Sequence, residues 1–374
     1  MNKLNELIHT LCPNGVEYKP LEACCQILDN MRRPVTKASR ESGEYPYYGA
    51  NGIQDYVSDY IFDGIFVLVG EDGSVVTPSG NPIVNWAEGK IWVNNHAHII
   101  AEKEGTLLRY LFHFIQTVNV SALVHGNIPK LTGGDFRAIR VPVPPLPVQS
   151  EIVRILDNFT ELTAELTAEL TARKKQYEYY RDDLIEHPRG EVVDYKMGDK
   201  LTFLNGRAYK QEELLSEGKY PVLRVGNFYT NDSWYYSDLE LEEAKYCNKG
   251  DLLYSWAATL GPKIWDGEKC IFHYHIWKIL FDEKAINKEY LYYYLQYDLA
   301  KIAKSTTKST MIHVSMGSMK ERKLILPSLD EQKRIAALIS KFDTLCCDIK
   351  NGLPAEIKAR QSQYEHYREK LLTF

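Results

Sequence analysis

The sequence lacks the long apolar segments of a membrane protein. Its uninterrupted apolar runs, such as residues 65–69, are about five residues long, whereas a helix that spans a bilayer needs about 18 or more apolar residues. The N-terminal segment has neither the apolar core nor the small-residue cleavage site of a signal peptide. We therefore expect a cytoplasmic protein that has no membrane partner.

Cysteine is scarce and unpatterned. The seven cysteines are an odd number and form no Cys-x-x-Cys motif, which argues against a disulfide framework and against a structural zinc site. Two His-x-His pairs, at residues 96–98 and 273–275, could ligate a metal from one face of a strand. Neither pair has a recognisable third ligand, so we expect structural histidines and no metal.

Motifs for catalysis are also missing. There is no Gly-x-x-x-x-Gly-Lys-Ser/Thr phosphate loop, and residues 81–84 depart from the Asn-Pro-Pro-Tyr tetrapeptide of an adenine methyltransferase. A metal-dependent nuclease could use Glu88 and Lys90 together with Asp63 or Asp72. That spacing arises often by chance, and the second half of the chain does not preserve it. We predict a non-catalytic chain that binds no cofactor.

The negative net charge of −5 argues against a polyanionic partner. The charge is unevenly distributed, however. Residues 301–323 contain six basic residues and one acid, and residues 32–40 contain four basic residues and no acid. A nucleic-acid partner is therefore allowed, although composition does not require one.

The chain contains two copies of one unit. The segment Val143–Leu162 returns as Leu326–Leu345, and residues 176–185 return as residues 363–372. The His-x-His pairs form a weaker match between the halves. The repeat length is about 180 residues, and each copy consists of a globular part followed by a long helix.

In both helical segments apolar residues recur at steps of three and four over about 35 residues, which is typical of a coiled-coil seam. Two equivalent helices can bury each other, although each helix packing on its own domain is an open alternative. The first segment contains a tandem Thr-Ala-Glu-Leu repeat, and the second contains Gly352 and Pro354, which predict a kink.

The globular parts are rich in glycine, proline, asparagine and aromatic residues and contain short strand-like runs. We predict an α+β protein with two mixed α/β domains in a pseudo-twofold repeat, separated by a long helical pair. The predicted boundaries are 1–146 and 188–328 for the domains, and 147–187 and 329–374 for the helices.

Two segments have residues suited to DNA. The loop at residues 45–52 combines tyrosines, an asparagine and glycines, and the stretch at residues 305–315 combines a lysine with hydroxyl groups; its counterpart is residues 125–131. Asparagine can read adenine, and basic or hydroxyl side chains can contact phosphate. The candidate DNA-binding residues are Arg32, Arg33, Lys37, Tyr47, Tyr48, Asn51, Asn127, Lys130, Arg224, Asn227, Lys304 and Lys308.

Within this set we predict different tasks. Lys304 and Lys308 are expected to contact phosphates, and Tyr48 and Asn51 are expected to face bases. Each of these segments could equally be a solvated loop or pack against its own sheet.

Several of these segments together resemble the specificity subunit of type I restriction–modification systems. They are the opening LCPNGVEYKPL, the loop YPYYGANG, the helix starts PPLPVQSEIVRILDNF and PSLDEQKRIAALISKF, and the closing QYEHYREKLLTF. The similarity covers nearly the whole chain and includes its two-copy architecture. The Thr-Ala-Glu-Leu tandem resembles the spacer repeat of one branch of that family. The residues that this resemblance selects for spacing or partner docking are Thr163, Leu166, Thr167, Leu170, Tyr177 and Tyr364.

The resemblance implies that the two domains each read one half of a bipartite, asymmetric sequence in double-stranded DNA. It implies that two modification subunits dock on the antiparallel helices and bind S-adenosylmethionine. Restriction subunits would add ATP- and Mg²⁺-dependent translocation and cleavage. Two alternatives remain: a single-chain metal-dependent nuclease, and a coiled-coil scaffold that joins two protein-binding modules.

Overall fold

The computed structural model describes residues 2–374 of the chain, with the exception of residues 74, 127–128, 230, 306–312 and 348–351. The chain forms two compact units. Unit 1 contains residues 1–167 and 356–374, and unit 2 contains residues 168–355. Within the described residues, every helix is too short or too polar to cross a membrane.

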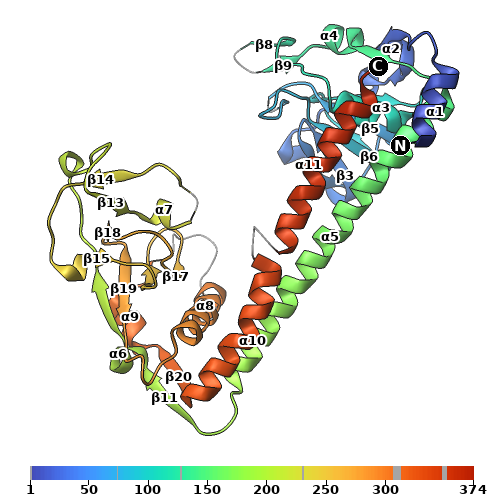
Figure 1. Ribbon diagram of the computed structural model, residues 1–374. Coiled ribbons are helices and arrows are strands. Elements are labelled where there is room, and N and C mark those ends of the chain that lie inside the picture. Colours follow the sequence, from blue (N-terminus) through green and yellow to red (C-terminus); the bar gives the residue numbers. More distant parts are fainter. Residues whose placement is uncertain (1, 74, 127–128, 230, 306–312, 348–351) are drawn as a thin grey trace. The chain divides into compact units, whose positions relative to one another are not determined.

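Unit 1 holds the first globular part (Figure 1). Its elements are α1 (Asn2–Leu11), β1 (Tyr18–Pro20), α2 (Leu21–Cys24), β2 (Gln26–Ile27), η1 (Asp29–Met31), η2 (Lys37–Ser39), β3 (Ser42–Gly49), β4 (Gly52–Val57), β5 (Phe62–Gly70), β6 (Val84–Val93), β7 (Ala97–Ala101), α3 (Leu108–Ile115), β8 (Val124–His125), β9 (Lys130–Leu131), α4 (Gly133–Ala138) and β10 (Arg140–Pro142).

The first part of α5 (Leu146–Glu186) and most of α11 (Leu353–Leu372) complete unit 1. A mixed sheet in the order β2-β7-β5-β6-β3-β4 forms its centre, with β3 and β6 parallel and the other neighbours antiparallel. One face of the sheet packs on α3, α5 and α11 in a core that includes Val67, Val69, Ile100, Ile152 and Leu371.

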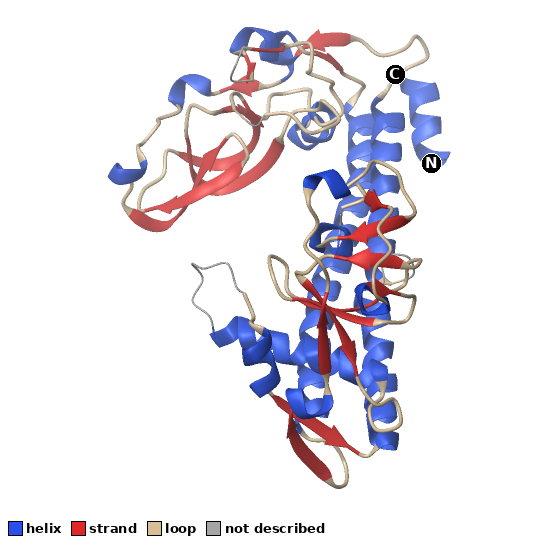
Figure 2. Cartoon of the chain, turned by 90° about the vertical axis from the view of Figure 1, so that its left-hand side faces the viewer, coloured by secondary structure: helices blue, strands red, loops and turns tan. Residues whose placement is uncertain are grey.

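Unit 2 holds the second globular part. Its elements are β11 (Val192–Lys196), α6 (Met197–Lys200), β12 (Thr202–Asn205), η3 (Gln211–Glu213), β13 (Tyr220–Leu223), α7 (Val225–Tyr229), β14 (Tyr235–Ser237), η4 (Glu243–Lys245), β15 (Tyr246–Cys247), β16 (Leu252–Ser255), β17 (Gly261–Ile264), β18 (Cys270–Phe272), β19 (Ile276–Leu280), α8 (Lys288–Ser305), α9 (Met316–Glu321), β20 (Lys323–Pro327) and α10 (Leu329–Cys347). In both units the strands gather in the globular part, and the long helices lie outside it (Figure 2).

The two globular parts repeat the same strand order. In unit 2 the sheets run β12-β19-β16-β17 and β14-β13-β18-β15, with β13 and β18 parallel. The order matches that of unit 1 if β15 and β16 are the two halves of β5, and β17 and β18 are the two halves of β6. The pair Cys247–Cys270 then occupies the position of Phe62–Ile91. The ribbon β11–β20 corresponds to β1–β10 in the same way.

Strand register corrects one detail of the sequence repeat. The amide of Glu71 donates to the carbonyl of His96, and the amide of Trp256 donates to the carbonyl of His275, both at the end of equivalent strands. His96 therefore corresponds to His275, and His98 corresponds to Trp277. The match between the His-x-His pairs is therefore two residues out of register. A comparison of the sequences does not detect this error, because moving a strand by two residues keeps each of its side chains on the same face of the sheet.

The long helices contact each other within each unit. In unit 1 the ring of Phe159 on α5 stacks on Tyr367 of α11 at 5.3 Å, and in unit 2 Tyr180 of α5 stacks on Phe342 of α10 at 5.7 Å. Leu156 and Leu371 belong to one core, and α5 and α11 run side by side in opposite directions (Figure 1). The predicted antiparallel pair is thus present.

The second helical segment consists of two helices where the sequence predicted one kinked helix. α10 ends at Cys347 and α11 begins at Leu353, with Pro354 in its first turn. Proline is tolerated there because the first amides of a helix have no partner within the helix. Pro147 lies in the first turn of α5 for the same reason.

Candidate nucleic-acid interface

A buried glutamine attaches the first long helix to the sheet of unit 1. Gln149, in the first turn of α5, is fully buried. Its Oε1 accepts from the amide of Leu107 at 2.9 Å, directly before α3. Its Nε2 donates to the carbonyls of Gly105 at 3.1 Å and Pro144 at 2.7 Å. Three bonds from one side chain fix the start of α5 against the loop before α3.

Gln332 makes the same three bonds in unit 2. Its Oε1 accepts from the amide of Asn287 at 2.8 Å, directly before α8. Its Nε2 donates to the carbonyls of Ala285 at 3.1 Å and Pro327 at 2.9 Å. We did not predict this role from the sequence. Its signal is present there, since Gln149 and Gln332 are identical residues at matching positions of the repeat.

The two tyrosines that we selected for spacing or partner docking make hydrogen bonds within their own units. Tyr364 of α11 bonds to Nδ1 of His113 at 3.0 Å, and Nε2 of that ring bonds to Asp157 at 2.8 Å. Burial lowers the pKa of His113 and outweighs the opposing effect of Asp157. The ring is therefore neutral at pH 7, with Nε2 donating to the carboxylate and Nδ1 accepting from the tyrosine hydroxyl.

Tyr177 has the equivalent task in unit 2. It is 7% exposed, and its hydroxyl donates to Oε1 of Gln296 on α8 at 3.0 Å. Both tyrosines thus join a long helix to the short helix beneath the sheet. Tyr177 and Tyr364 are each packed in their own unit, and their role in spacing or partner docking stays a prediction.

The Thr-Ala-Glu-Leu repeat lies in the middle of α5. The hydroxyl of Thr163 donates to the Phe159 carbonyl at 2.8 Å, and that of Thr167 donates to the Thr163 carbonyl at 2.7 Å. Leu166 and Leu170 are half-buried. These leucines continue the apolar stripe of α5 through the repeat, while both hydroxyls bond to the helix itself. Their role in partner docking stays a prediction.

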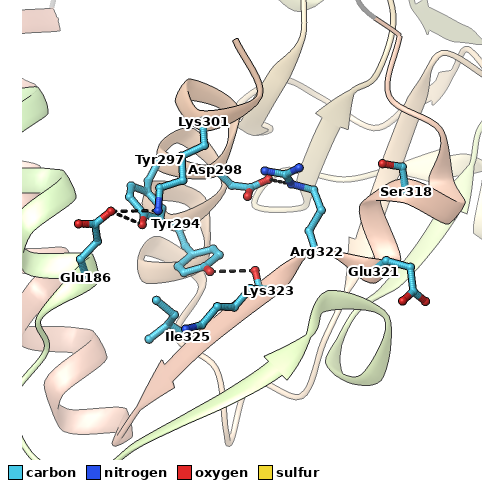
Figure 3. Close-up of a pocket in the computed structure, with 10 residues that line it drawn as sticks. All are labelled: Glu186, Tyr294, Tyr297, Asp298, Lys301, Ser318, Glu321, Arg322, Lys323 and Ile325. Atoms are coloured by element: carbon cyan, nitrogen blue, oxygen red, sulfur yellow. Dashed lines mark hydrogen bonds and ion pairs between the residues drawn. The ribbon is translucent and has the colours of Figure 1, made fainter. Parts of the chain in front are cut away.

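A pocket of about 580 Å³ in unit 2 is lined by α8, α9 and the end of α5 (Figure 3). Glu186 accepts from the Tyr297 hydroxyl at 2.6 Å and from Lys301 Nζ at 2.9 Å, which lowers its pKa. Asp298 pairs with Arg322 at 2.5 Å on the opposite wall. Because these charges pair with each other, the pocket attaches the end of α5 to α8, and nothing in it indicates a reaction.

A charged network surrounds the end of β5 in unit 1. Arg32 Nη1 bonds to Glu71 Oε2 at 2.6 Å and to the Ala97 carbonyl at 2.7 Å. Lys130 Nζ contacts Glu71 at 3.0 Å, and His98 Nδ1 lies 2.7 Å from Asp29. The guanidinium of Arg32 is 12% exposed. The prediction that Arg32 contacts DNA is therefore corrected, because its guanidinium is bound inside the protein. Lys130 forms an ion pair with Glu71 and is only partly available to DNA.

The same network contains the one cluster of possible metal ligands within the described part of the chain, Asp29, Glu71 and His98. Although burial acts to raise them, the pKa values of Asp29 and Glu71 are lowered by hydrogen bonds, from His98 in one case and from Arg32 and Lys130 in the other. The cations needed by these carboxylates come from the protein. The cluster is thus an internal ion-pair network and does not fit a bound metal.

The aromatic loop at residues 45–52 is a β-hairpin formed by β3 and β4. Tyr47 is fully buried, and its hydroxyl accepts from the Val35 amide at 3.0 Å; Tyr48 belongs to the core beneath the sheet. Asn51 is exposed in the turn between the strands. The predicted DNA-facing roles of Tyr47 and Tyr48 are therefore corrected, since both side chains are buried, and Asn51 remains accessible.

The remaining candidate DNA-binding residues differ in their exposure to solvent. Arg33 and Lys37 are exposed around η2, and Arg224 is exposed with its guanidinium 5.0 Å from the ring of Tyr235. The Asn227 amide donates to the carbonyls of Asn231 and Ser233, so it stabilises its own loop. Asn127, Lys308 and the side chain of Lys304 lie outside the described residues.

Three of the four residues of the nuclease alternative have other partners. Asp72 pairs with His96. Lys90 lies 4.6 Å from the ring of Tyr60, and Glu88 accepts from the Trp86 indole at 2.6 Å. Together these contacts do not form a carboxylate cluster with a lysine beside it.

Comparison with known proteins agrees with this architecture. The family model described as type I restriction modification DNA specificity domain matches residues 13–173 and again residues 190–359. A putative type I restriction enzyme specificity subunit of Haemophilus influenzae is 40% identical over 377 residues, covering 96% of each chain. The EcoR124I/EcoR124II specificity subunit of Escherichia coli is 32% identical over 292 residues, covering 72% of this chain and 71% of the other.

Solved structures share the fold at low sequence identity. The S subunit of a type I restriction–modification system from M. genitalium has a TM-score of 0.59 at 16% identity, covering 96% of this chain and 97% of the other. A chain from a study of complex assembly and conformational transition of the type I system has a TM-score of 0.63 at 14% identity, covering 96% and 98%. The chain belongs to the DNA specificity subunits of type I restriction–modification systems.

Proposed function

We propose that this chain selects a bipartite, non-palindromic DNA sequence for a type I restriction–modification enzyme. Each globular part reads one half-site, and the helical pair sets the number of base pairs between them. The observation that supports this most directly is the repeated sheet, in which equivalent backbone positions carry different side chains. A common frame with different surfaces is suited to reading two different sequences.

Specificity subunits are non-catalytic, and this chain is one of them. Its partners are double-stranded DNA, two modification subunits and the restriction subunits. S-adenosylmethionine binds to the modification subunits, and ATP and Mg²⁺ serve the restriction subunits. We further propose recognition domains at residues 1–146 and 188–328, joined by spacer helices at residues 147–187 and 329–374.

The accessible residues give a revised set of DNA contacts. Arg33 and Lys37 in unit 1 and Arg224 in unit 2 are exposed cations suited to phosphates. Asn51 lies exposed in a hairpin turn, where its amide can pair with an adenine edge. Phosphate contacts by Lys304 and Lys308 remain predictions.

The experiment for the whole proposal combines methylome sequencing with purified components. We expect this chain plus its modification subunit to methylate one bipartite sequence, and the chain alone to transfer no methyl group. Methylation or Mg²⁺-dependent cleavage by the chain alone would favour the nuclease alternative. A complex that binds all DNA sequences equally would favour the scaffold alternative.

Two substitutions separate the kinds of contact in unit 1. We expect Lys37→Ala to weaken binding of all sequences about equally and to reduce the salt slope by about one. We expect Asn51→Ala to relax the preference at one base pair and to leave the salt slope unchanged. The reverse result would contradict this division of tasks.

A further inference from the structure

Unit 2 has an aromatic surface where unit 1 has its charged network. The amide of Leu131 donates to the Glu71 carbonyl at 2.8 Å, and the amide of Val314 donates to the Trp256 carbonyl at 3.3 Å. Glu71 and Trp256 are therefore equivalent positions at the ends of equivalent strands. The rings around this position, which we name the ring surface, are Trp256, Tyr274, His275 and His313.

A stack of buried rings supports this surface from below. Tyr254 and Trp277 are buried and lie 5.9 Å apart at an interplanar angle of 19°. Trp256 continues the stack, 6.0 Å from Trp277 at 20°. Because the two inner rings belong to the core, the outer indole is held at a fixed height and angle. A preorganised ring loses little conformational entropy when it contacts a ligand.

The outer rings are arranged around Trp256. His275 lies edge-on at 4.9 Å, and Tyr274 and His313 lie at 6.0 and 6.2 Å. The indole Nε1 donates to the carbonyl of Tyr274 at 2.8 Å, which fixes the loop before β19. Tyr274 is 38% exposed and His313 is also exposed. The surface is therefore open at the side away from the stack.

The electrostatics differ from those of a phosphate site. Burial, followed by the effect of His313, lowers the pKa of His275, so its imidazole is neutral at pH 7. Burial, His275 and Arg224 lower the pKa of the neighbouring His273 to about 4. A neutral imidazole offers one hydrogen-bond donor and one acceptor, whereas a phosphate is met best by a cation.

We propose that the ring surface contacts base edges of the half-site that the second recognition domain binds. This inference rests on the proposed function. The faces of Trp256 and Tyr274 suit thymine methyl groups, and the ring nitrogens of His275 and His313 suit the donors and acceptors of base edges. Arg224, exposed beside His273, would contact the flanking phosphate.

The test uses the full complex with modification subunits and a pool of DNA duplexes randomised in both half-sites. Methylated duplexes are sequenced for the wild type, Tyr274→Ala and His275→Ala. We expect the preference at one or two adjacent base pairs of one half-site to fall about 10-fold in each variant. The preference in the other half-site and the spacer length should remain unchanged.

Leu280→Ala is the matched control, since Leu280 is an exposed residue at the other end of β19. It should leave both half-sites unchanged. Thermal unfolding is measured for every variant, and His313→Gln, at an exposed position, replaces a variant that does not fold. Equal weakening of all sequences, altered preference in both half-sites, or unchanged preference would each overturn the proposal. A wild-type complex without sequence-specific methylation would instead contradict the proposed function.

Discussion

The two globular parts share a backbone and differ in what it carries. Equivalent amide–carbonyl bonds surround Glu71 in unit 1 and Trp256 in unit 2. In the first unit the carboxylate is paired with Arg32 and Lys130, and in the second the indole completes an aromatic stack. The comparison indicates that strand pairing defines the frame, while side chains at the strand ends are free to diverge. A protein that must read two unrelated sequences benefits from this separation.

The comparison predicts that one recognition surface can be exchanged without the other. Replacing residues 14–143 by the equivalent segment of another specificity subunit should change one half-site completely and leave the second intact. The reason is that the attachment through Gln149 depends mainly on backbone groups, which the replacement also supplies. Methylome sequencing measures the result, and the reciprocal replacement of residues 191–326 is the control. A change in both half-sites would show that the domains do not act separately.

The next largest effect is expected from the helix that runs through both units. Inserting a third Thr-Ala-Glu-Leu after Leu170 adds about 6 Å of rise and about 400° of rotation. The half-buried Leu166 and Leu170 indicate that the apolar stripe continues through such a repeat. B-DNA rises about 3.4 Å and turns about 34–36° per base pair. We expect an unchanged pair of half-sites with a spacer longer by one base pair, two at most.

Methylome sequencing again provides the readout for the longer helix. The control places the same four residues after Pro188, beyond the end of α5 at Glu186, where the helix keeps its length. That variant should retain the original spacer. Full activity on the original site after the insertion within α5 would mean that this helix does not set the distance.

The shared frame can be tested through its two glutamines. Gln149→Ala and Gln332→Ala each leave buried backbone groups without partners, so each should reduce the local free energy of unfolding by about 3 kcal/mol. Hydrogen exchange of α3 and α8 reports each unit separately. Gln363→Ala, at an exposed position of α11, should change stability by less than about 0.5 kcal/mol. A large effect in one unit only would break the proposed equivalence.

The smallest effect is a difference in acid sensitivity. Burial, His275 and Arg224 hold the pKa of His273 at about 4 in the folded protein, against about 6.5 when unfolded. As the pH falls below about 6.5 the unfolded state takes up the proton first, so unit 2 loses stability until about pH 4. Because the ring is only half-buried, we expect about 1 kcal/mol.

His273→Gln should remove most of this pH dependence. The equivalent residue of unit 1 is Asn94, since the amides of both donate to the neighbouring parallel strand, at Tyr48 and Leu223. Asparagine does not titrate, so Asn94 does not make the stability of unit 1 depend on pH. Hydrogen exchange of β18 between pH 7 and pH 5, compared between the wild type and His273→Gln, measures the contribution of this histidine. An unchanged slope in the variant would assign the effect to another group.

The repeat and the long helices could be predicted from the sequence because their signals are local. A period of three and four residues indicates a helix wherever it occurs, and α5 spans Leu146–Glu186 against a predicted 147–187. The two-copy architecture follows from ordered matches such as Gln149 and Gln332. The helical period and the internal repeat can both be recognised without knowledge of the tertiary structure.

The surface could be predicted only in part, because strand register and burial depend on distant residues. The tyrosines of the loop at residues 45–52 looked accessible, but Tyr47 is buried against Val35 and Arg40, and Tyr48 packs in the core. Arg32 belongs to a basic stretch, but its partner Glu71 lies 39 residues away in the sequence. The ring surface joins residues from three separate segments and has no sequence motif of its own.

Each unit is completed by a helix from the other copy. α11 ends the second copy yet packs against Phe159 in unit 1, where the hydroxyl of Tyr18 donates to the carbonyl of Phe374. The second part of α5 ends the first copy yet packs in unit 2. The chain therefore corresponds to a domain-swapped homodimer whose two protomers were fused head to tail. A single copy, residues 1–187, would have to recover its missing helix from a second molecule. Light scattering should detect that pair, and its identical halves would select a palindrome.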